Sequence, residues 1–441
     1  MSPEFIAISM FVVLLIFLFM GHPLAFVLGG VGFLFGFFTQ GWNFFGMVMT
    51  RIYGTMDNFV LVAITLFILM GNFLTMSGVA DELFKALRVL FGPIRGGVGL
   101  AVIAVCIVFA ACTGIVGASV VTMGLLSGPF LLRYGYSKEL TMGMVAAGGS
   151  LGILIPPSIM LVMMADQTGQ SAGKLLMCGV VPGVVLGILY MIYIAVVCWI
   201  KPEMGPAIPA EELAKIPVSK RIIDSLKFAL PPLALIFTVL GVIFFGIATP
   251  TEAAAVGSAA SFVMIIAYRK LDWKNFSDTI YATAKTVTMV ITILIGATTF
   301  TGVFITQGGG QAMVDTIMGL GMGRWGTYWM MQLIYIILGC FIDWIGIIMI
   351  TFPIFLPICK ALGFDTLWFT AMLAINLQMS FLTPPFGYAL FYLSGMGLEG
   401  IKLSHIYRGV VPFLILQFIG ILICTYWPEV VVWLPNAMIG K

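Results

Sequence analysis

Two adjacent prolines in the middle of an apolar run constrain this chain more than any other feature. The stretch Gly148–Met164 has the composition of a membrane-spanning helix, yet Pro156 and Pro157 occupy its centre. A proline inside a helix removes a backbone hydrogen bond and clashes with the carbonyl one turn earlier, which costs about 3 kcal/mol. The pattern therefore predicts a helix that opens within the bilayer, where free backbone groups are tolerated only inside protein or along a cavity.

The same device recurs in the second half of the chain, where Pro384 and Pro385 interrupt another apolar run. The same offset also pairs other helix-breaking residues in the same order, such as Pro129 with Pro357. Two interrupted helices at matched positions of two halves are typical of secondary transporters, whose binding site lies between the repeats. Prolines that only shape helix packing are the alternative, but packing alone gives no reason for a double proline to repeat at matched positions.

The composition places the chain in a membrane. It has 441 residues, of which 61% are hydrophobic and 9% charged, whereas soluble domains carry roughly 25% charged residues. The net charge of +3 indicates no nucleic-acid partner, because the basic residues lie between apolar spans. Seven cysteines form no CxxC pair and only two histidines are present, so we expect no zinc, haem or other cofactor. Phe5–Met20 follows no basic region, and we expect a retained span rather than a signal peptide.

We expect an all-α polytopic membrane protein built as an inverted repeat of two halves with five crossings each. The halves are residues 1–200 and 228–441, and a polar, proline-rich cytoplasmic linker at 201–227 joins them. Each half is expected to hold scaffold spans, a re-entrant hairpin and a broken helix. The hairpins are expected at 96–134 and 325–361, and the broken helices at 138–164 and 366–393.

Amphipathic stretches predict arms that lie along the membrane interface. Val79–Phe91 carries an apolar stripe opposite four charged residues, which is the pattern of an interfacial helix. In the second half, an arm over Leu271–Thr283 is expected to precede a separate span over Ala284–Thr306. The last span is expected at Val410–Trp433.

The basic residues favour hairpins over full crossings. If both hairpins are re-entrant and the linker is cytoplasmic, most of the 21 basic residues fall on the inner side, as the positive-inside rule requires. Both termini are then periplasmic, the first hairpin enters from the cytoplasm and the second enters from the periplasm. Hairpins that cross fully would give six crossings per half, parallel repeats and a more even spread of charge, so this alternative ranks second.

Oxygen atoms at the two hairpin tips and the two helix breaks predict a binding site for sodium. Backbone carbonyls at helix ends and hydroxyl groups are the ligands that a hard cation prefers, although any single hydroxyl would more often bond to its own helix. The sodium candidates are Thr113, Gly114, Gly117, Ser119 and Gly152 in the first half, and Asp343, Trp344, Gly346, Ser380 and Thr383 in the second. The helix breaks themselves are the expected substrate region, with Ser150, Pro156, Pro157, Pro384 and Pro385.

Three acidic residues have different expected roles. Asp343 lies deep in an apolar segment, where an acid is costly and therefore suggests function, with a water-exposed hairpin cap as the alternative. Glu252 follows Thr249 and Thr251, and we expect it to stabilise a helix N-terminus. Asp166 ends the first broken helix, and we expect it to reach the outer surface.

Four segments of the chain resemble the large membrane subunit of TRAP (tripartite ATP-independent periplasmic) transporters, within the ion-transporter superfamily. The similarity extends over essentially the whole chain, and the order of the double-proline segments makes it specific. The segments are TGIVGAS at Thr113–Ser119, GGSLGILIPPS at Gly148–Ser158, ATPTEAAAVG at Ala248–Gly257 and FLTPPFGYALFYL at Phe381–Leu393.

The resemblance implies an elevator mechanism in the bacterial inner membrane, in which a transport domain of hairpins and broken helices slides against a scaffold. It implies sodium coupling, an organic-acid substrate, a periplasmic substrate-binding protein and a small four-helix membrane subunit as partners. The family's sodium positions carry over only to the tips and breaks named above.

Other functions remain as alternatives. A self-sufficient ion-coupled carboxylate carrier or antiporter of the same superfamily would need no binding protein. A channel fits less well, because the features that resemble gates are paired and inverted. An intramembrane protease would need a second acid or a Ser–His pair at the midplane, and the sequence shows neither, so no catalytic residue is expected.

Overall fold

The computed structural model describes residues 3–114, 116–214, 216–384 and 387–439, without side chains for residues 3, 4, 110–113 and 439. The secondary structure of this part of the chain is helical, as the sequence predicts. The first half contains α1 (Pro3–Phe19), α2 (Leu24–Gln40), α3 (Asn43–Met56), α4 (Phe59–Ser77), α5 (Val79–Phe91), α6 (Gly97–Thr113), α7 (Val116–Arg133), α8 (Lys138–Ser150), η1 (Leu151–Ile153), α9 (Ile159–Thr168) and α10 (Ala172–Ile200).

The second half repeats this order after a short linker that carries η2 (Pro202–Met204) and α11 (Ala210–Ala214). It contains α12 (Val218–Phe244), α13 (Pro250–Ala267), α14 (Trp273–Thr306), α15 (Gly309–Gly319), α16 (Gly323–Gly339), α17 (Trp344–Ala361), α18 (Thr366–Ser380), α19 (Tyr388–Gly395), α20 (Leu403–Tyr426) and α21 (Glu429–Ile439).

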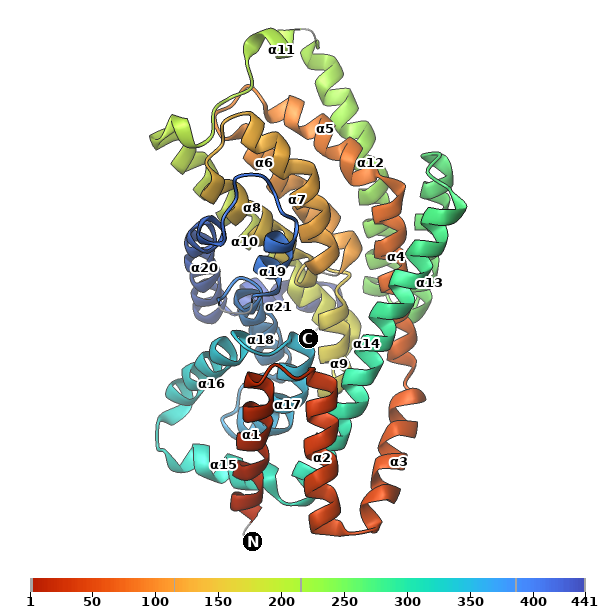
Figure 1. The fold of residues 1–441 in the computed structure, drawn as a ribbon, viewed down its shortest axis with the longest axis vertical. Helices are drawn as coiled ribbons and strands as arrows, with labels where there is room; N and C mark the ends of the chain where they lie inside the picture. Colours follow the sequence, from red (N-terminus) through yellow and green to blue (C-terminus); the bar gives the residue numbers. More distant parts are fainter. Residues whose placement is uncertain (1–2, 115, 215, 385–386, 440–441) are drawn as a thin grey trace.

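Corresponding elements of the two halves lie at opposite ends of the molecule (Figure 1). The helix pair α1–α2 lies at the lower end of the view and the pair α12–α13 at the upper right. The hairpin α6–α7 lies above the centre, whereas α16–α17 lies below it. This arrangement is the one that an inverted repeat predicts.

Eight of the described helices are long and apolar enough to cross a bilayer. They include α7 and α17, the second helix of each hairpin, so length alone does not distinguish the hairpins from full spans. With the shorter apolar helices such as α2, they make the chain a multi-pass membrane protein.

Three helix boundaries differ from the expected ones. The arm and the span expected on either side of residue 284 form one helix of 34 residues, α14, because no glycine or proline interrupts the sequence before Gly296. The helix α12 starts at Val218, inside the expected linker, because Pro217 precedes it and no breaker follows for three turns. The expected last span divides into α20 and α21 at Pro428.

Close contacts at two glycines of the first half pack it against the second half. A Cβ atom at Gly143 of α8 would collide with the carbonyl oxygen of Gly409 in α20, so the two backbones touch where these helices cross. A Cβ at Gly124 of α7 would meet the sulfur of Met396, beyond α19, at 2.6 Å. Both contacts join elements from opposite halves, and the second places the first hairpin against the end of the second broken helix.

Candidate functional site

The broken helices are interrupted where the prolines predict. The first break separates η1 from α9 and contains Pro156 and Pro157. Ser158 then starts α9, because its hydroxyl oxygen accepts a hydrogen bond from the amide of Leu161 at 3.2 Å. The second break separates α18 from α19 and contains Pro384.

The tip of the first hairpin lies directly on the first break. Gly114 has a positive φ of 61°, a conformation that favours glycine because it has no Cβ atom. A Cβ at this position would lie 3.2 Å from the carbonyl oxygen of Pro157. On the other side of the tip, a Cβ at Gly117 would lie 2.8 Å from the ring of Tyr392 in α19. The tip therefore fits between the broken helices of both halves.

Asp343 starts the second helix of the second hairpin. Its carboxylate accepts a hydrogen bond from the amide of Ile345 at 3.4 Å, so it is the N-cap of α17. The side chain is half-buried and lines a cavity that both hairpin tips share. The residue is thus a hairpin cap, half-buried rather than exposed to water, and it also lies in the candidate site.

A cavity of about 110 Å³ lies where both tips and both breaks meet. The two hairpins contribute Gly114 and Asp343, the broken helices contribute Ile159 and Phe381, and the side of the cavity opposite them is formed by α4 and α14. Residues up to 324 positions apart in the sequence therefore face one small volume at the centre of the fold.

Four helices begin at this cavity. Their first residues line it, and these are Val116 of α7, Ile159 of α9, Trp344 of α17 and Tyr388 of α19. The first amide groups of a helix have no partners within the helix, and the N-terminal end carries a partial positive charge. Ser158 caps α9 and Asp343 caps α17, but the partial positive charges of the four ends together still favour an anion there without any basic side chain.

Helix C-termini lie next to the same cavity and favour cations. The helix α18 ends at Ser380, and the following residue, Phe381, lines the cavity. The hydroxyl oxygen of Ser380 is buried, packs against Gly339 at the end of α16, and has no hydrogen-bond partner in the described part of the chain. A buried oxygen of this kind fits the first coordination shell of a sodium ion.

The other sodium candidates differ in where they lie. Gly114, Gly117, Asp343 and Trp344 line the cavity. Thr383 does not line it, and its hydroxyl donates to the carbonyl of Met379 at 2.6 Å. Three further candidates are buried but do not line the cavity, namely Ser119, Gly152 and Gly346. A Cβ at Gly346 would meet Leu24 of α2, so this glycine faces the scaffold rather than the break. The side chain of Thr113 lies outside the described residues.

The expected substrate residues lie around the cavity rather than in its lining. The hydroxyl of Ser150 donates to the carbonyl of Ala147 at 2.9 Å, within its own helix. Pro156 faces a separate apolar cavity against α12, and Pro385 lies outside the described residues. Pro156, Pro157 and Pro384 therefore set the shape of the backbone, and their side chains do not line the central cavity.

Sequence reasoning missed three hydroxyl groups that the structure places at the cavity. They belong to Tyr388 and Tyr392 of α19 and to Thr286 of α14. The two tyrosines stand four residues apart after the double proline, so both fall on one face of the helix that starts there. That spacing is a signal in the sequence, whereas nothing local identifies Thr286.

Glu252 has the structural role that the sequence predicts. The hydroxyl oxygen of Thr249 accepts a hydrogen bond from the Glu252 amide at 3.3 Å, and the Glu252 carboxylate accepts from the Thr249 amide at 2.8 Å. The pair forms a capping box at the start of α13, away from the cavity lining.

Comparison with protein families gives one match over most of the chain. A family model described as "Tripartite ATP-independent periplasmic transporter, DctM component" matches residues 11–430. The chain is 34% identical over 387 residues to the C4-dicarboxylate TRAP transporter large permease protein DctM of Pseudomonas aeruginosa, and the match covers 88% of each protein.

Similar proteins include permeases named for other compounds. The chain is 29% identical to the sialic acid TRAP transporter large permease protein SiaM of Vibrio cholerae, over 96% of this chain and 97% of that protein. Among solved structures, the YdaH transporter of Alcanivorax borkumensis has a TM-score of 0.65 and covers 97% of this chain at 12% identity, which shows a shared fold.

Proposed function

The chain belongs to the family of DctM components of TRAP transporters, and on that premise we propose that it moves an organic acid across the bacterial inner membrane together with sodium ions. The observation that carries the proposal is the set of four helix N-termini around the central cavity, beside the C-terminal ends of other helices. One kind of helix end favours an anion and the other a cation, so the site suits an acid and its coupling ion together.

The proposed substrate is a small carboxylate. No basic side chain lines the central cavity in the described part of the chain, so the anion is held by backbone amides, by the hydroxyls of Tyr388 and Tyr392, and by the sodium ions. The names of the similar permeases, for C4-dicarboxylates and for sialic acid, agree with this class.

The proposed motion is an elevator movement of the hairpins and broken helices against α4 and α14. The scaffold side of the cavity is mostly apolar, with Ile68, Met289, Val290 and Ile293, and Thr286 is its one polar side chain among the described residues. Sliding along such a wall breaks few hydrogen bonds, which favours a movement of the whole unit. In this proposal both termini are periplasmic.

The proposed partners are a small four-helix membrane subunit and a periplasmic protein that delivers the substrate. Some similar permeases include more than this chain does. The isethionate TRAP transporter permease protein DctMQ of Oleidesulfovibrio alaskensis matches 85% of this chain, yet the match covers only 58% of that protein. The additional part of such a protein agrees with a requirement for a second membrane component.

Uptake into proteoliposomes tests the proposal. The chain is reconstituted with its small subunit, and radiolabelled succinate or sialic acid is added with the purified periplasmic binding protein. We expect uptake only with an inward sodium gradient and only with the binding protein. Equal uptake with potassium in place of sodium would contradict the coupling, and uptake without the binding protein would favour a self-sufficient carrier.

A further inference from the structure

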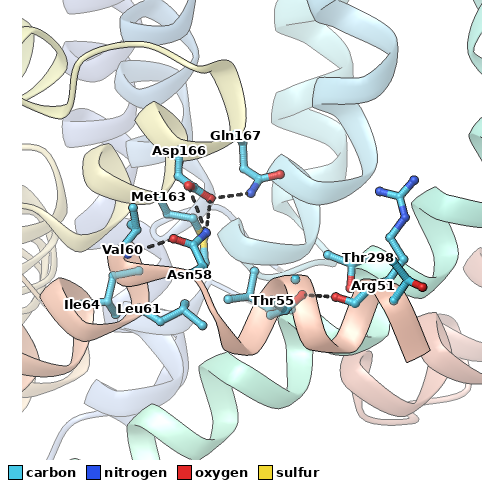
Figure 2. Close-up of a pocket in the computed structure, with 13 residues that line it drawn as sticks. Arg51, Thr55, Asn58, Val60, Leu61, Ile64, Met163, Asp166, Gln167 and Thr298 are labelled. Carbon is cyan, nitrogen blue, oxygen red and sulfur yellow. Dashed lines mark hydrogen bonds between the residues drawn. The ribbon is translucent and has the colours of Figure 1, made fainter. Parts of the chain in front are cut away.

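A second cavity, of about 280 Å³, lies between the scaffold and the first broken helix (Figure 2). Its wall is partly polar and partly apolar, and comes mainly from α3, α4, α9 and α14. The lining includes Arg51, Asn58, Asp166, Gln167 and Thr298. The central cavity described above has a single acidic side chain and no basic one in its described lining, whereas this cavity has a charge of each sign.

The second cavity is lined by the same three helices as the central one, α4, α9 and α14, one helical turn further along. We call this line along the three helices the seam. On α9 the lining residue changes from Ile159 to Met163, and on α14 from Val290 to Leu294. On α4 it changes from Ile68 to Ile64. Four residues in a helix rise by about 6 Å. The three helices therefore line both cavities at successive levels, so a small molecule that leaves the central cavity along this seam meets the second one.

The carboxylate of Asp166 is already occupied. It accepts hydrogen bonds from the side-chain amide of Asn58 at 3.0 and 3.1 Å, and from that of Gln167 at 2.9 Å. Figure 2 shows these three side chains together on one side of the cavity. Neutral amides hold the acid, so it does not neutralise Arg51 through an ion pair.

Arg51 is the one basic side chain in the described lining, and its guanidinium has no such partner. None of the hydrogen bonds or ion pairs found within the described part of the chain involves this guanidinium, and in Figure 2 the Arg51 side chain lies apart from Asp166. The bond drawn there to Arg51 joins the Thr55 hydroxyl to the main-chain carbonyl of Arg51. The hydroxyls of Thr55 and Thr298 donate to carbonyls of their own helices, at 2.9 and 3.1 Å. Arg51 therefore supplies free donors, whereas these threonine hydroxyls already donate to backbone carbonyls.

We propose that this cavity is a second anion site, in which Arg51 binds a carboxylate of the substrate before or after the substrate binds at the hairpin tips. The inference rests on the proposed function, because it takes the cargo to be an acid. Arg51 lines the cavity and is also exposed to solvent, so an anion can reach it. A guanidinium presents paired N–H groups that match a carboxylate, and a cation that lines a cleft raises the local concentration of anions. The seam thus connects a site where the anion binds the charged side chain of Arg51 to the central site, where it binds helix N-termini.

A cysteine at position 54 tests the charge of the cavity without knowledge of the cargo. Gly54 lines the cavity three residues after Arg51, and a Cβ there meets no atom within 4 Å, so Gly54→Cys fits. The variant, reconstituted with its small subunit, is treated with methanethiosulfonate reagents that carry a sulfonate or a quaternary ammonium group. The protein without the added cysteine gives the background from native thiols.

We expect the anionic reagent to react faster, and Arg51→Gln to lower the ratio of the anionic to the cationic rate by about tenfold. Arg51→Lys should keep most of the ratio, because it keeps the charge. Lys360→Gln is the matched control, since it removes an exposed positive charge that lies outside the cavity lining. Its ratio should stay within about twofold of the parent, because solvent and salt screen distant exposed charges.

Succinate provides the second measurement on the same preparations. It should slow the modification of Gly54→Cys when Arg51 is present and not when Gln replaces it. A ratio that Arg51→Gln leaves unchanged, or protection that persists in that variant, would overturn the proposed anion site. If sodium-driven uptake were still measured in these preparations, the proposed function would stand without the anion site. If the cavity were charge-selective but no such uptake were measured, the anion site would stand and the proposed function would be wrong.

Discussion

The contact between Asn58 and Asp166 should stabilise one position of the hairpins and broken helices, the proposed transport unit, relative to the scaffold. Asn58 stands at the start of the scaffold helix α4, and Asp166 stands near the end of α9, which moves in the proposed mechanism. Hydrogen bonds to a charged group contribute about 1.5–3 kcal/mol. Both side chains are half-buried, so we take the lower value, and about 1.4 kcal/mol corresponds to a tenfold change in an equilibrium constant.

The variant Asn58→Ser separates this contact from the cap of α4. The Asn58 side chain accepts a hydrogen bond from the amide of Val60 at 2.9 Å, and serine is an equally good N-cap. Serine lacks the long amide that reaches Asp166. We therefore expect Asn58→Ser to shift the population away from the position seen here by about tenfold, with little loss of thermal stability.

Spin labels measure the shift. Labels on cysteines at Trp273 of α14 and Lys360 of α17 report the distance between scaffold and transport unit, and both parent residues are exposed. Five of the six described native cysteines are buried, so few of them compete for the label. An unchanged distance distribution in Asn58→Ser would refute the reasoning. A shift of equal size in an Asp166→Ala background would also refute it, because the contact is already absent there.

The remaining predictions concern the coupling ion, the packing and a helix cap. Asp343→Asn should weaken the dependence of uptake on sodium, since it removes the one acidic side chain among the described lining residues of the central cavity. An unchanged sodium titration of uptake would exclude this role. Gly143→Ala should lower the free energy of unfolding by about 1–3 kcal/mol, because its Cβ collides with the backbone of Gly409. Gly54→Ala is the matched control in thermal unfolding, since it has open space, and an equal loss in both variants would contradict the packing argument. Thr249→Ala should cost about 1 kcal/mol through loss of the capping box, while the sodium titration stays as in the parent protein. A changed titration would show that this cap contributes to transport.

The breaks were predictable because adjacent prolines remove helical hydrogen bonds, and the helices are interrupted at Pro156 and Pro384. The surroundings also matter, since α12 continues through another double proline, Pro231 and Pro232. The continuous helix α14 was missed because an amphipathic stretch followed by an apolar one looks like two elements, although nothing in its sequence ends the first. Absence of a breaker is as informative as its presence.

The contacts between distant elements could not be predicted from the sequence. Asn58 and Asp166 are 108 residues apart, and only the packing of α9 against α4 brings them together. Thr286 lines the central cavity for the same reason. The two tyrosines of α19 were within reach of sequence reasoning, because their spacing places them on one helix face once the break is located.

The four helix beginnings at the central cavity have a consequence for how such a permease changes over evolution. Main-chain amides are present whatever the side chains are, so mutation cannot easily remove the attraction for negative charge. Substitutions such as those at Tyr388 or Trp344 would alter the shape and size of the compartment while its polarity persists. If the proposed function holds, new substrate preferences can then arise one residue at a time, without an intermediate that no longer binds acids.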